Sequence, residues 1–355
     1  MSKSKEQVIL SVLKKIAPGT ALRQGLDHIL AARTGALIVI GDIDKVMSIV
    51  NGGFRLECPF TPQKLYELAK MDGAIIVDGD ISRILLANVH LVPDSSLPTS
   101  ETGMRHRTAE RVSKHTKALV ISISQKREVV TLYINDYKYA LEDIRVVLAK
   151  ANQALQTLEK YKFRLDQVSS NLTALEFQNL VVPLDVVAVL QRAEMVSRIT
   201  HEIEHYIGEL GVEGRLLRMQ LDELVGGVEE ETLMVIKDYC EDSAQSPTMR
   251  RKLGLMDAEE ILDAAKVAAI LGFEPGASLT DEAVGPRGYR LLNRIPRLPA
   301  KVEEAIIEEF KELQALLSAS VEELDRVEGV GEVRARAIAD GLRRLKEYSL
   351  LEKFA

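Results

Sequence analysis

The chain has 355 residues, more than one hydrophobic core usually holds, so we expect two or three domains. Hydrophobic side chains make up 46% and charged ones 28%, a composition typical of a globular, helix-rich protein. The formal net charge of −7 excludes a general nucleic-acid coat, although it leaves room for a small basic patch on one domain.

The cysteines and the N-terminus indicate the compartment. Cys58 and Cys240 lie in different segments far apart in the chain, so a disulfide framework is not expected. The N-terminal residues lack the apolar core of a signal peptide, and no apolar run approaches the ~20 residues of a membrane span. We therefore expect a cytoplasmic protein with no membrane partner.

Residues 1–138 predict an α/β domain with one mixed sheet. Apolar residues at helical spacing predict helices at 7–16 and 21–33, and two more helices are expected at 61–70 and 107–117. Short β-branched runs, each bounded by Gly, Asp, Pro or charge, predict mostly buried strands. These runs are 36–41, 74–80, 84–91, 118–124 and 129–136.

From Tyr139 onward the pattern predicts helices alone. Apolar residues recur at steps of three and four, the stripe of a long amphipathic helix. They are Leu141, Ile144, Leu148, Ala151, Leu155 and Leu158. More helical stretches follow, so residues 139–285 are interpreted as an all-α spine.

Residues 286–355 predict a third, small all-α domain. Its first part, residues 286–301, holds five basic residues and no acidic one. Two helices then follow, joined by the turn Glu328-Gly329-Val330-Gly331.

Two segments of the N-terminal domain together predict a nucleotide-polyphosphate site. Asp72 offers a carboxylate to a hard cation such as Mg²⁺ or Mn²⁺, and Gly73 permits close backbone approach. A cationic stretch stands at the start of a predicted helix, whose free N–H groups attract anions. Its candidate binding residues are Thr102, Gly103, Arg105, His106, Arg107 and Thr108. Alone, either element could be an ordinary capped turn or a solvated charge cluster.

A third element lies at the end of the strand predicted at 118–124. Ser122, Ser124 and Arg127 stand at or just past this strand end, the usual ligand-binding edge of an open α/β sheet. The sequence contains no P-loop that would explain nucleotide binding in another way.

These motifs make the sequence recognisable. Asp72-Gly73-Ala74, the run from Glu101 to Arg111 with Arg105-His106-Arg107, and Ser122-Ile123-Ser124-Gln125 resemble the signature of the diadenylate cyclase family. The three-part organisation resembles the DisA family over essentially the whole chain. Position 104 is Met, where that family usually has Thr.

The resemblance implies condensation of two ATP molecules into 3',5'-cyclic di-AMP, with release of two pyrophosphates. It implies that Asp72 holds Mg²⁺ or Mn²⁺ near the attacking 3'-hydroxyl and that Gly73 contacts the nucleotide. It also implies that Arg105, His106, Arg107 and Thr108 bind phosphates, and that Ser124 and Arg127 bind the triphosphate tail.

The symmetry of that product bears on assembly. Because the product is twofold symmetric, two facing copies of the site are the natural arrangement, so a dimer is the minimum. The family forms octamers.

The C-terminal turn resembles a helix-hairpin-helix DNA-binding unit. Gly329, Val330 and Gly331 would direct backbone N–H groups at one DNA phosphate, and Arg334 and Arg336 would add basic contacts. Such contacts read backbone shape and weaken with salt. The resemblance implies binding of branched DNA such as Holliday junctions, which suppresses cyclase activity, and hence a role in DNA damage and repair.

Two alternatives stay open. The first is a non-catalytic scaffold that binds DNA and senses ATP, a hypothesis that Met104 supports. The second is a zinc peptidase, because His201-Glu202-Ile203-Glu204-His205 matches H-E-x-x-H. No third ligand motif accompanies this match, and a solvated helix face is the preferred interpretation of the segment.

Overall fold

The computed structural model describes residues 3–273 and 279–352, and the chain divides into two compact units. Unit 1 is α/β and unit 2 is all-α, so the predicted fold class is confirmed. Three helices contribute residues to both units: α6 (Ile144–Gln178), α7 (Pro183–Leu210) and α8 (Arg215–Val225). Unit 1 comprises Met1–Asn152 and Glu204–Arg218, and unit 2 comprises Gln153–Ile203 and Met219–Ala355.

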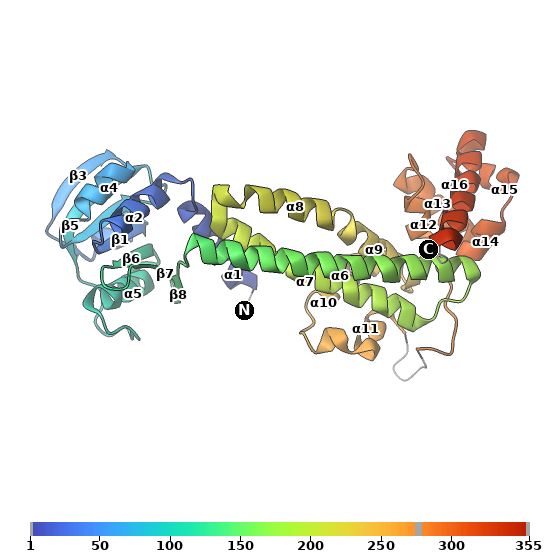
Figure 1. The fold of residues 1–355 in the computed structure, drawn as a ribbon, viewed down its shortest axis with the longest axis horizontal. Helices are drawn as coiled ribbons and strands as arrows, with labels where there is room; N and C mark the ends of the chain where they lie inside the picture. The colour runs from blue at the N-terminus through green and yellow to red at the C-terminus, as the bar shows by residue number, and fades with distance from the viewer. Residues whose placement is uncertain (1–2, 274–278, 353–355) are drawn as a thin grey trace. The chain divides into compact units, whose positions relative to one another are not determined.

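Unit 1 contains a mixed β-sheet (Figure 1). The sheet has eight strands in the order β2-β5-β4-β1-β6-β7-β8, with β3 paired to β5. Among the strand pairs of the described residues, only β1 and β4 are parallel to each other. The five strands predicted from apolar runs are present as β1 (Ala36–Gly41), β4 (Ala74–Asp78), β5 (Arg83–Leu91), β6 (Leu119–Ser124) and β7 (Val129–Ile134). Three strands were not predicted, namely β2 (Val50–Asn51), β3 (Phe54–Pro59) and β8 (Tyr137–Ala140). The reason is that all but a few of their side chains are exposed, so they carry no apolar run.

Helices cover both faces of this sheet. One core contains Leu13, Leu26 and Leu65 from the helices α1, α2 and α4, packed against strand residues such as Ile38. The opposite core packs Val112 of α5 against the other face of the same strands. The helices of unit 1 are α1 (Lys3–Ile16), α2 (Ala21–Ala31), α3 (Ile43–Met47), α4 (Pro62–Leu68) and α5 (Met104–Thr116).

Helix α5 begins earlier than predicted. The sequence predicted its start at residue 107, but Gly103 is the N-cap and the helix runs from Met104. The Gly103 backbone is extended, with φ −82° and ψ 137°, so the helical bonds begin directly after it. The three residues of the Arg105-His106-Arg107 motif therefore lie in the first turn of the helix.

Unit 2 consists of helices joined by short connections. Its remaining helices are α9 (Val228–Tyr239), α10 (Ser246–Leu253), α11 (Ala264–Leu271), α12 (Tyr289–Asn293), α13 (Ala300–Phe310), α14 (Leu313–Ser318), α15 (Val321–Asp325) and α16 (Gly331–Glu352). Short 3₁₀ turns stand at Ser243–Gln245 and Glu260–Leu262 in unit 2, and a further one at Gly211–Gly214 belongs to unit 1. Within residues 3–273 and 279–352, no helix is long and apolar enough to cross a bilayer.

A buried ion pair joins the C-terminal helices of unit 2 to the helical spine. The Arg290 side chain is 1% exposed and pairs with Glu176 of α6, which is equally buried. Asp238, at the end of α9, accepts backbone N–H bonds from Gly288 and Tyr289 at 2.7 Å and from Arg290 at 3.0 Å. These bonds satisfy the free N–H groups at the start of α12. Arg290 therefore belongs to the interior, although its segment had a surface-like, basic composition.

Candidate functional site

One edge of the sheet gathers the predicted nucleotide residues. Ile38 of β1 pairs with Ile75 of β4, and Ala36 of β1 pairs with Ile123 of β6. Asp72 lies two residues before the start of β4, Gly35 lies directly before β1, and Ser124 is the last residue of β6. Because β1 is parallel to β4 and antiparallel to β6, these strand ends lie at the same edge of the sheet.

Arg105 reaches this same edge from α5. Its Nη1 donates to the carbonyl of Ile123 at 3.4 Å, next to Ser124. A Cβ built on Gly35 would lie 2.1 Å from the same Nη1, so the guanidinium occupies the space that a side chain at Gly35 would need. The structure therefore brings the start of β4 and the Arg105 segment to one edge of the sheet, although Asp72 and Arg105 are 33 positions apart in sequence.

His106 faces inward and is held by a chain of hydrogen bonds. Its Nδ1 lies 2.9 Å from the hydroxyl of Tyr133, and this hydroxyl donates to Glu101 at 2.9 Å. Lys138 pairs with the same Glu101 oxygen at 2.5 Å. Burial raises the pKa of Glu101, but the bonds from Lys138 and Tyr133 outweigh it and hold that pKa below its ordinary value. Glu101 is therefore a carboxylate.

The other candidate residues lie around the start of α5 and past the end of β6. Thr102, Gly103 and Arg107 are exposed, and Thr108 donates its hydroxyl hydrogen to the Met104 carbonyl at 3.0 Å. Gly103 makes no side-chain cap, so no side chain satisfies the first N–H groups of the helix. Exposed Arg127 donates its backbone N–H to Ser124 Oγ at 3.3 Å. The exposed Arg107 side chain and the first N–H groups of α5 are accessible to an anion, whereas the Thr108 hydroxyl hydrogen and the Arg127 backbone N–H are already bonded within the chain.

The packing of the neighbouring strand requires glycine at position 73. A Cβ at this position would lie 2.3 Å from the Asn88 carbonyl carbon and 2.7 Å from the Val89 nitrogen, both backbone atoms. The Gly73 N–H also donates to Asn88 Oδ1 at 3.1 Å. Asn88 has a positive φ of 54° in β5, where the pairing with β4 is irregular. The absence of a side chain is thus required by the neighbouring strand, whatever Gly73 contributes to a ligand.

Gly73→Ala is therefore expected to destabilise unit 1 by about 1–3 kcal/mol, because strand backbones must move apart to admit a methyl group. The measurement is hydrogen–deuterium exchange of β4 and β5 without nucleotide. Gly79→Ala is the matched control, since its Cβ would meet only the Gly41 carbonyl oxygen at 3.9 Å. Unchanged exchange in Gly73→Ala would show that the residue serves a ligand alone.

The metal assignment depends on Asp72. Within the described ranges 3–273 and 279–352, no three His, Cys, Asp or Glu side chains form a metal-binding cluster. Mg²⁺ is commonly held by one or two carboxylates together with substrate phosphates. An exposed Asp72 beside the Arg105 edge fits that mode of binding, in which the nucleotide supplies the remaining oxygens.

The C-terminal turn has the geometry of a tight hairpin. Gly329 and Gly331 have φ of 82° and 65°, values that side chains with a Cβ rarely adopt. Val330, between them, is 3% exposed and anchors the turn in the core of the C-terminal helices. Arg334 Nη1 bonds the Gly329 carbonyl at 2.6 Å, whereas Arg336 pairs with Glu332 on its own helix.

The H-E-x-x-H segment has other contacts. His201 Nδ1 bonds the Ser197 carbonyl at 2.7 Å, as expected for a side chain lying along its own helix. His205 packs edge-on against the Tyr139 ring, with centroids 6.4 Å apart. In the part of the chain that the structure describes, no third His, Cys, Asp or Glu joins these two histidines in a metal-binding cluster.

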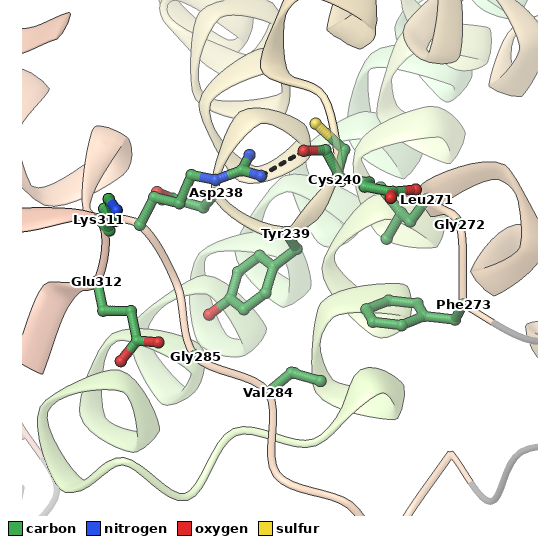
Figure 2. Close-up of a pocket in the computed structure, with 12 residues that line it drawn as sticks. Asp238, Tyr239, Cys240, Leu271, Gly272, Phe273, Val284, Gly285, Lys311 and Glu312 are labelled. Carbon is green, nitrogen blue, oxygen red and sulfur yellow. Dashed lines mark hydrogen bonds between the residues drawn. The ribbon is translucent and has the colours of Figure 1, made fainter. Parts of the chain in front are cut away.

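A cavity of about 550 Å³ lies in unit 2 and holds none of the predicted residues. Figure 2 shows Lys311 and Glu312 on one wall and Phe273 on the opposite one. The guanidinium of Arg287, which also lines the cavity, is already bonded to the Lys237 and Glu241 carbonyls. We assign no ligand to it.

Sequence reasoning missed several residues that shape the site: Gly35, Glu101, Tyr133 and Lys138. Tyr133 carried a usable signal, because a tyrosine inside a buried strand needs a partner for its hydroxyl. Glu101 stood within the quoted motif but was given no role. Gly35 and Lys138 carried no local signal, since their contacts come from segments distant in sequence.

Comparison with known proteins covers almost the whole chain. Residues 23–137 match the family model described as "DisA bacterial checkpoint controller nucleotide-binding", residues 141–280 the DisA linker region, and residues 312–341 the helix-hairpin-helix motif.

Two relatives, both described as "DNA integrity scanning protein DisA", are similar at full length. The one from Symbiobacterium thermophilum is 57% identical over 96% of this chain and 97% of its own. The one from Clostridium tetani is 52% identical over 98% of this chain and 97% of its own. A solved structure of DacA from Staphylococcus aureus covers 40% of this chain and 91% of its own at 23% identity, but its TM-score of 0.28 is too low to carry an argument. On the sequence matches, the chain belongs to the DisA family.

Proposed function

We propose that the protein is a diadenylate cyclase that condenses two ATP molecules into 3',5'-cyclic di-AMP and releases two pyrophosphates. The observation that supports the proposal is that the start of β4, which Asp72 precedes, the end of β6 at Ser124 and the Arg105 side chain lie at one sheet edge. The family assignment and the nucleotide-binding model over residues 23–137 support it.

The proposed chemistry follows from the groups at this edge. Mg²⁺ or Mn²⁺ bound by Asp72 would supply a Lewis acid for phosphate oxygens. Arg105, Arg107 and the uncapped N–H groups of α5 bind and neutralise the triphosphate. Ser124, Arg127 and Thr108 contribute further polar contacts. Most of the rate enhancement comes from positioning and charge stabilisation, as in other phosphoryl-transfer reactions.

A single copy of the site would hold one nucleotide and form no product. Each 3'-hydroxyl must attack the α-phosphorus of the other ATP, so two copies must face each other across a twofold axis. Met104, 79% exposed at the start of α5, and the exposed Arg107 are accessible to a second copy. We propose a dimer at minimum, with an octamer as the complete assembly.

The test is direct. The full chain is incubated with ATP and Mg²⁺ or Mn²⁺, and the products are identified by mass spectrometry. Cyclic di-AMP with two equivalents of pyrophosphate supports the proposal. Bound ATP without product would favour the ATP-sensing scaffold, and cleavage of peptides that stops on chelation would favour the peptidase.

We further propose that the C-terminal hairpin binds branched DNA such as Holliday junctions and that this binding regulates the cyclase, associating the protein with DNA repair. The support is the helix-hairpin-helix match and the positive φ of its two turn glycines. Arg334 braces the turn through the Gly329 carbonyl, and Arg336 remains at the surface as a basic contact.

Replacing Gly329 and Gly331 with valine is expected to abolish binding of a synthetic four-way junction. Each β-branched residue at positive φ costs roughly 1–2 kcal/mol, and the turn would rearrange away from the phosphate. The measurement is fluorescence anisotropy at fixed salt, beside a cyclase assay that should stay near wild type. Gly227→Val is the control, because its φ of 78° imposes the same strain in the linker. Equal loss of DNA binding and cyclisation would contradict the proposal that the C-terminal hairpin binds DNA and the N-terminal site carries out the cyclisation.

A further inference from the structure

The hydrogen bonds around His106 determine which of its ring nitrogens carries the hydrogen. Tyr133 has one hydroxyl hydrogen, and the geometry directs it to Glu101 Oε1 at 2.9 Å. Glu101 is ionised and can only accept. Burial, reinforced by the Glu101 carboxylate, raises the pKa of Tyr133, so the hydroxyl keeps its hydrogen.

The contact with His106 must therefore run in the opposite direction. The Tyr133 oxygen lies 2.9 Å from Nδ1 and has no second hydrogen to offer, so Nδ1 must donate. A neutral imidazole with hydrogen on Nδ1 has a bare lone pair on Nε2. Burial lowers the pKa of His106, against the opposing charge of Glu101, and so favours this neutral ring.

From this geometry we propose that Tyr133 and Glu101 are positioning residues that hold His106 as the Nδ1–H tautomer, with Nε2 as a hydrogen-bond acceptor in the nucleotide site. A bare phosphate oxygen is also an acceptor and cannot pair with that lone pair. The ligand group that Nε2 meets must carry hydrogen, and in ATP these groups are the ribose hydroxyls and the adenine amino group. Because the neighbouring Arg105 and Arg107 are assigned to the triphosphate, and the ribose is joined to the triphosphate, we assign Nε2 to a ribose hydroxyl. This role rests on the proposed cyclase function. It assigns His106 to the hydroxyl and leaves the phosphates to Arg105 and Arg107.

Lys138 stabilises the arrangement from the far end. Its ammonium group and the Tyr133 hydroxyl both bond the same oxygen, Oε1 of Glu101. In a Glu101→Gln variant, the amide carbonyl oxygen at the position of Oε1 could therefore accept both bonds. Removal of the oxygen would free the Tyr133 hydroxyl to turn and donate to Nδ1, which would move the histidine hydrogen to Nε2.

The test is a solid-state ¹⁵N spectrum of the full chain labelled at its histidine nitrogens. The chain has six histidines, and the difference from a His106→Gln spectrum isolates the one ring. Wild type should show the Nδ1–H form above the pKa of His106, and Tyr133→Phe should show the Nε2–H form. Glu101→Leu should also give Nε2–H, whereas Glu101→Gln should keep Nδ1–H.

Tyr139→Phe is the matched control, because Tyr139 makes the same kind of bond to Glu209, at 2.9 Å, and does not contact His106. It should leave the His106 signal unchanged. An Nε2–H signal in wild type, or an unchanged signal in Tyr133→Phe, would overturn the proposal. If Tyr133→Phe does not fold, the comparison of Glu101→Leu with Glu101→Gln tests the same proposal.

The spectrum is independent of turnover, so it separates this proposal from the cyclase itself. If wild type shows Nδ1–H but makes no cyclic di-AMP, the cyclase proposal fails and the tautomer stands. If both hold, Tyr133→Phe should lower turnover about tenfold, the order of one lost hydrogen bond, and should change the pH profile. An unaltered rate and pH profile in that variant would contradict the assigned role of Nε2.

Discussion

Replacing Asp72 with asparagine is expected to abolish cyclic di-AMP formation, with a loss in turnover of at least about 100-fold. Asparagine has nearly the same shape but no negative charge, so it binds a divalent cation among phosphate oxygens much more weakly. The exposed side chain precedes β4 and is not part of the core, so the fold should be retained. The measurement is product formation from ATP, together with ATP affinity with and without Mg²⁺.

Asp80→Asn is the matched control for this experiment. Asp80 is also exposed, but it lies in the turn after β4, at the opposite end of the same strand from Asp72. The same chemical change there should leave the rate unaltered. Turnover at the wild-type rate in Asp72→Asn, or equal losses in the two variants, would remove Asp72 from the proposed site.

Replacing Arg290 with methionine is expected to destabilise unit 2 by about 3–5 kcal/mol, because it leaves the buried Glu176 carboxylate without its partner. Arg290 bonds Glu176 through Nη2 and the Ser169 carbonyl through Nη1 at 3.4 Å. Glu176 also accepts from the Tyr239 hydroxyl at 2.8 Å, so the charge joins α6, α9 and α12. The measurement is denaturant-dependent hydrogen–deuterium exchange in α9 and α12, which separates unit 2 from unit 1.

Arg294→Met is the control, since the Arg294–Glu231 pair at 2.9 Å is more than one-third exposed on both sides. Such a pair contributes ~0–1 kcal/mol after solvent screening. The double variant Arg290→Met with Glu176→Gln should recover part of the loss, because the unpaired Glu176 charge is then no longer buried. If Arg290→Met destabilises unit 2 no more than Arg294→Met does, the buried Arg290–Glu176 pair is not what holds these helices together.

The family relationship and the fold class could be read from local patterns. The five apolar runs between residues 36 and 136 became β1, β4, β5, β6 and β7, because burial of a strand depends on side chains within that strand. Strands β3 and β8 were missed because their stability comes from pairing with β5 and β7, which leaves most of their own side chains exposed.

The sequence by itself determined the family, the strand runs of the N-terminal domain and the residue types of the candidate site, because these depend on composition and short-range spacing. Only the tertiary structure decided that Arg105 lies against Gly35 and that Glu101 orients Tyr133 toward His106. It also decided that Gly73 is required by Asn88 and that Arg290 is buried. Each of these facts is a contact between segments far apart in the chain, and such contacts are set by strand register and helix packing, which no local pattern contains.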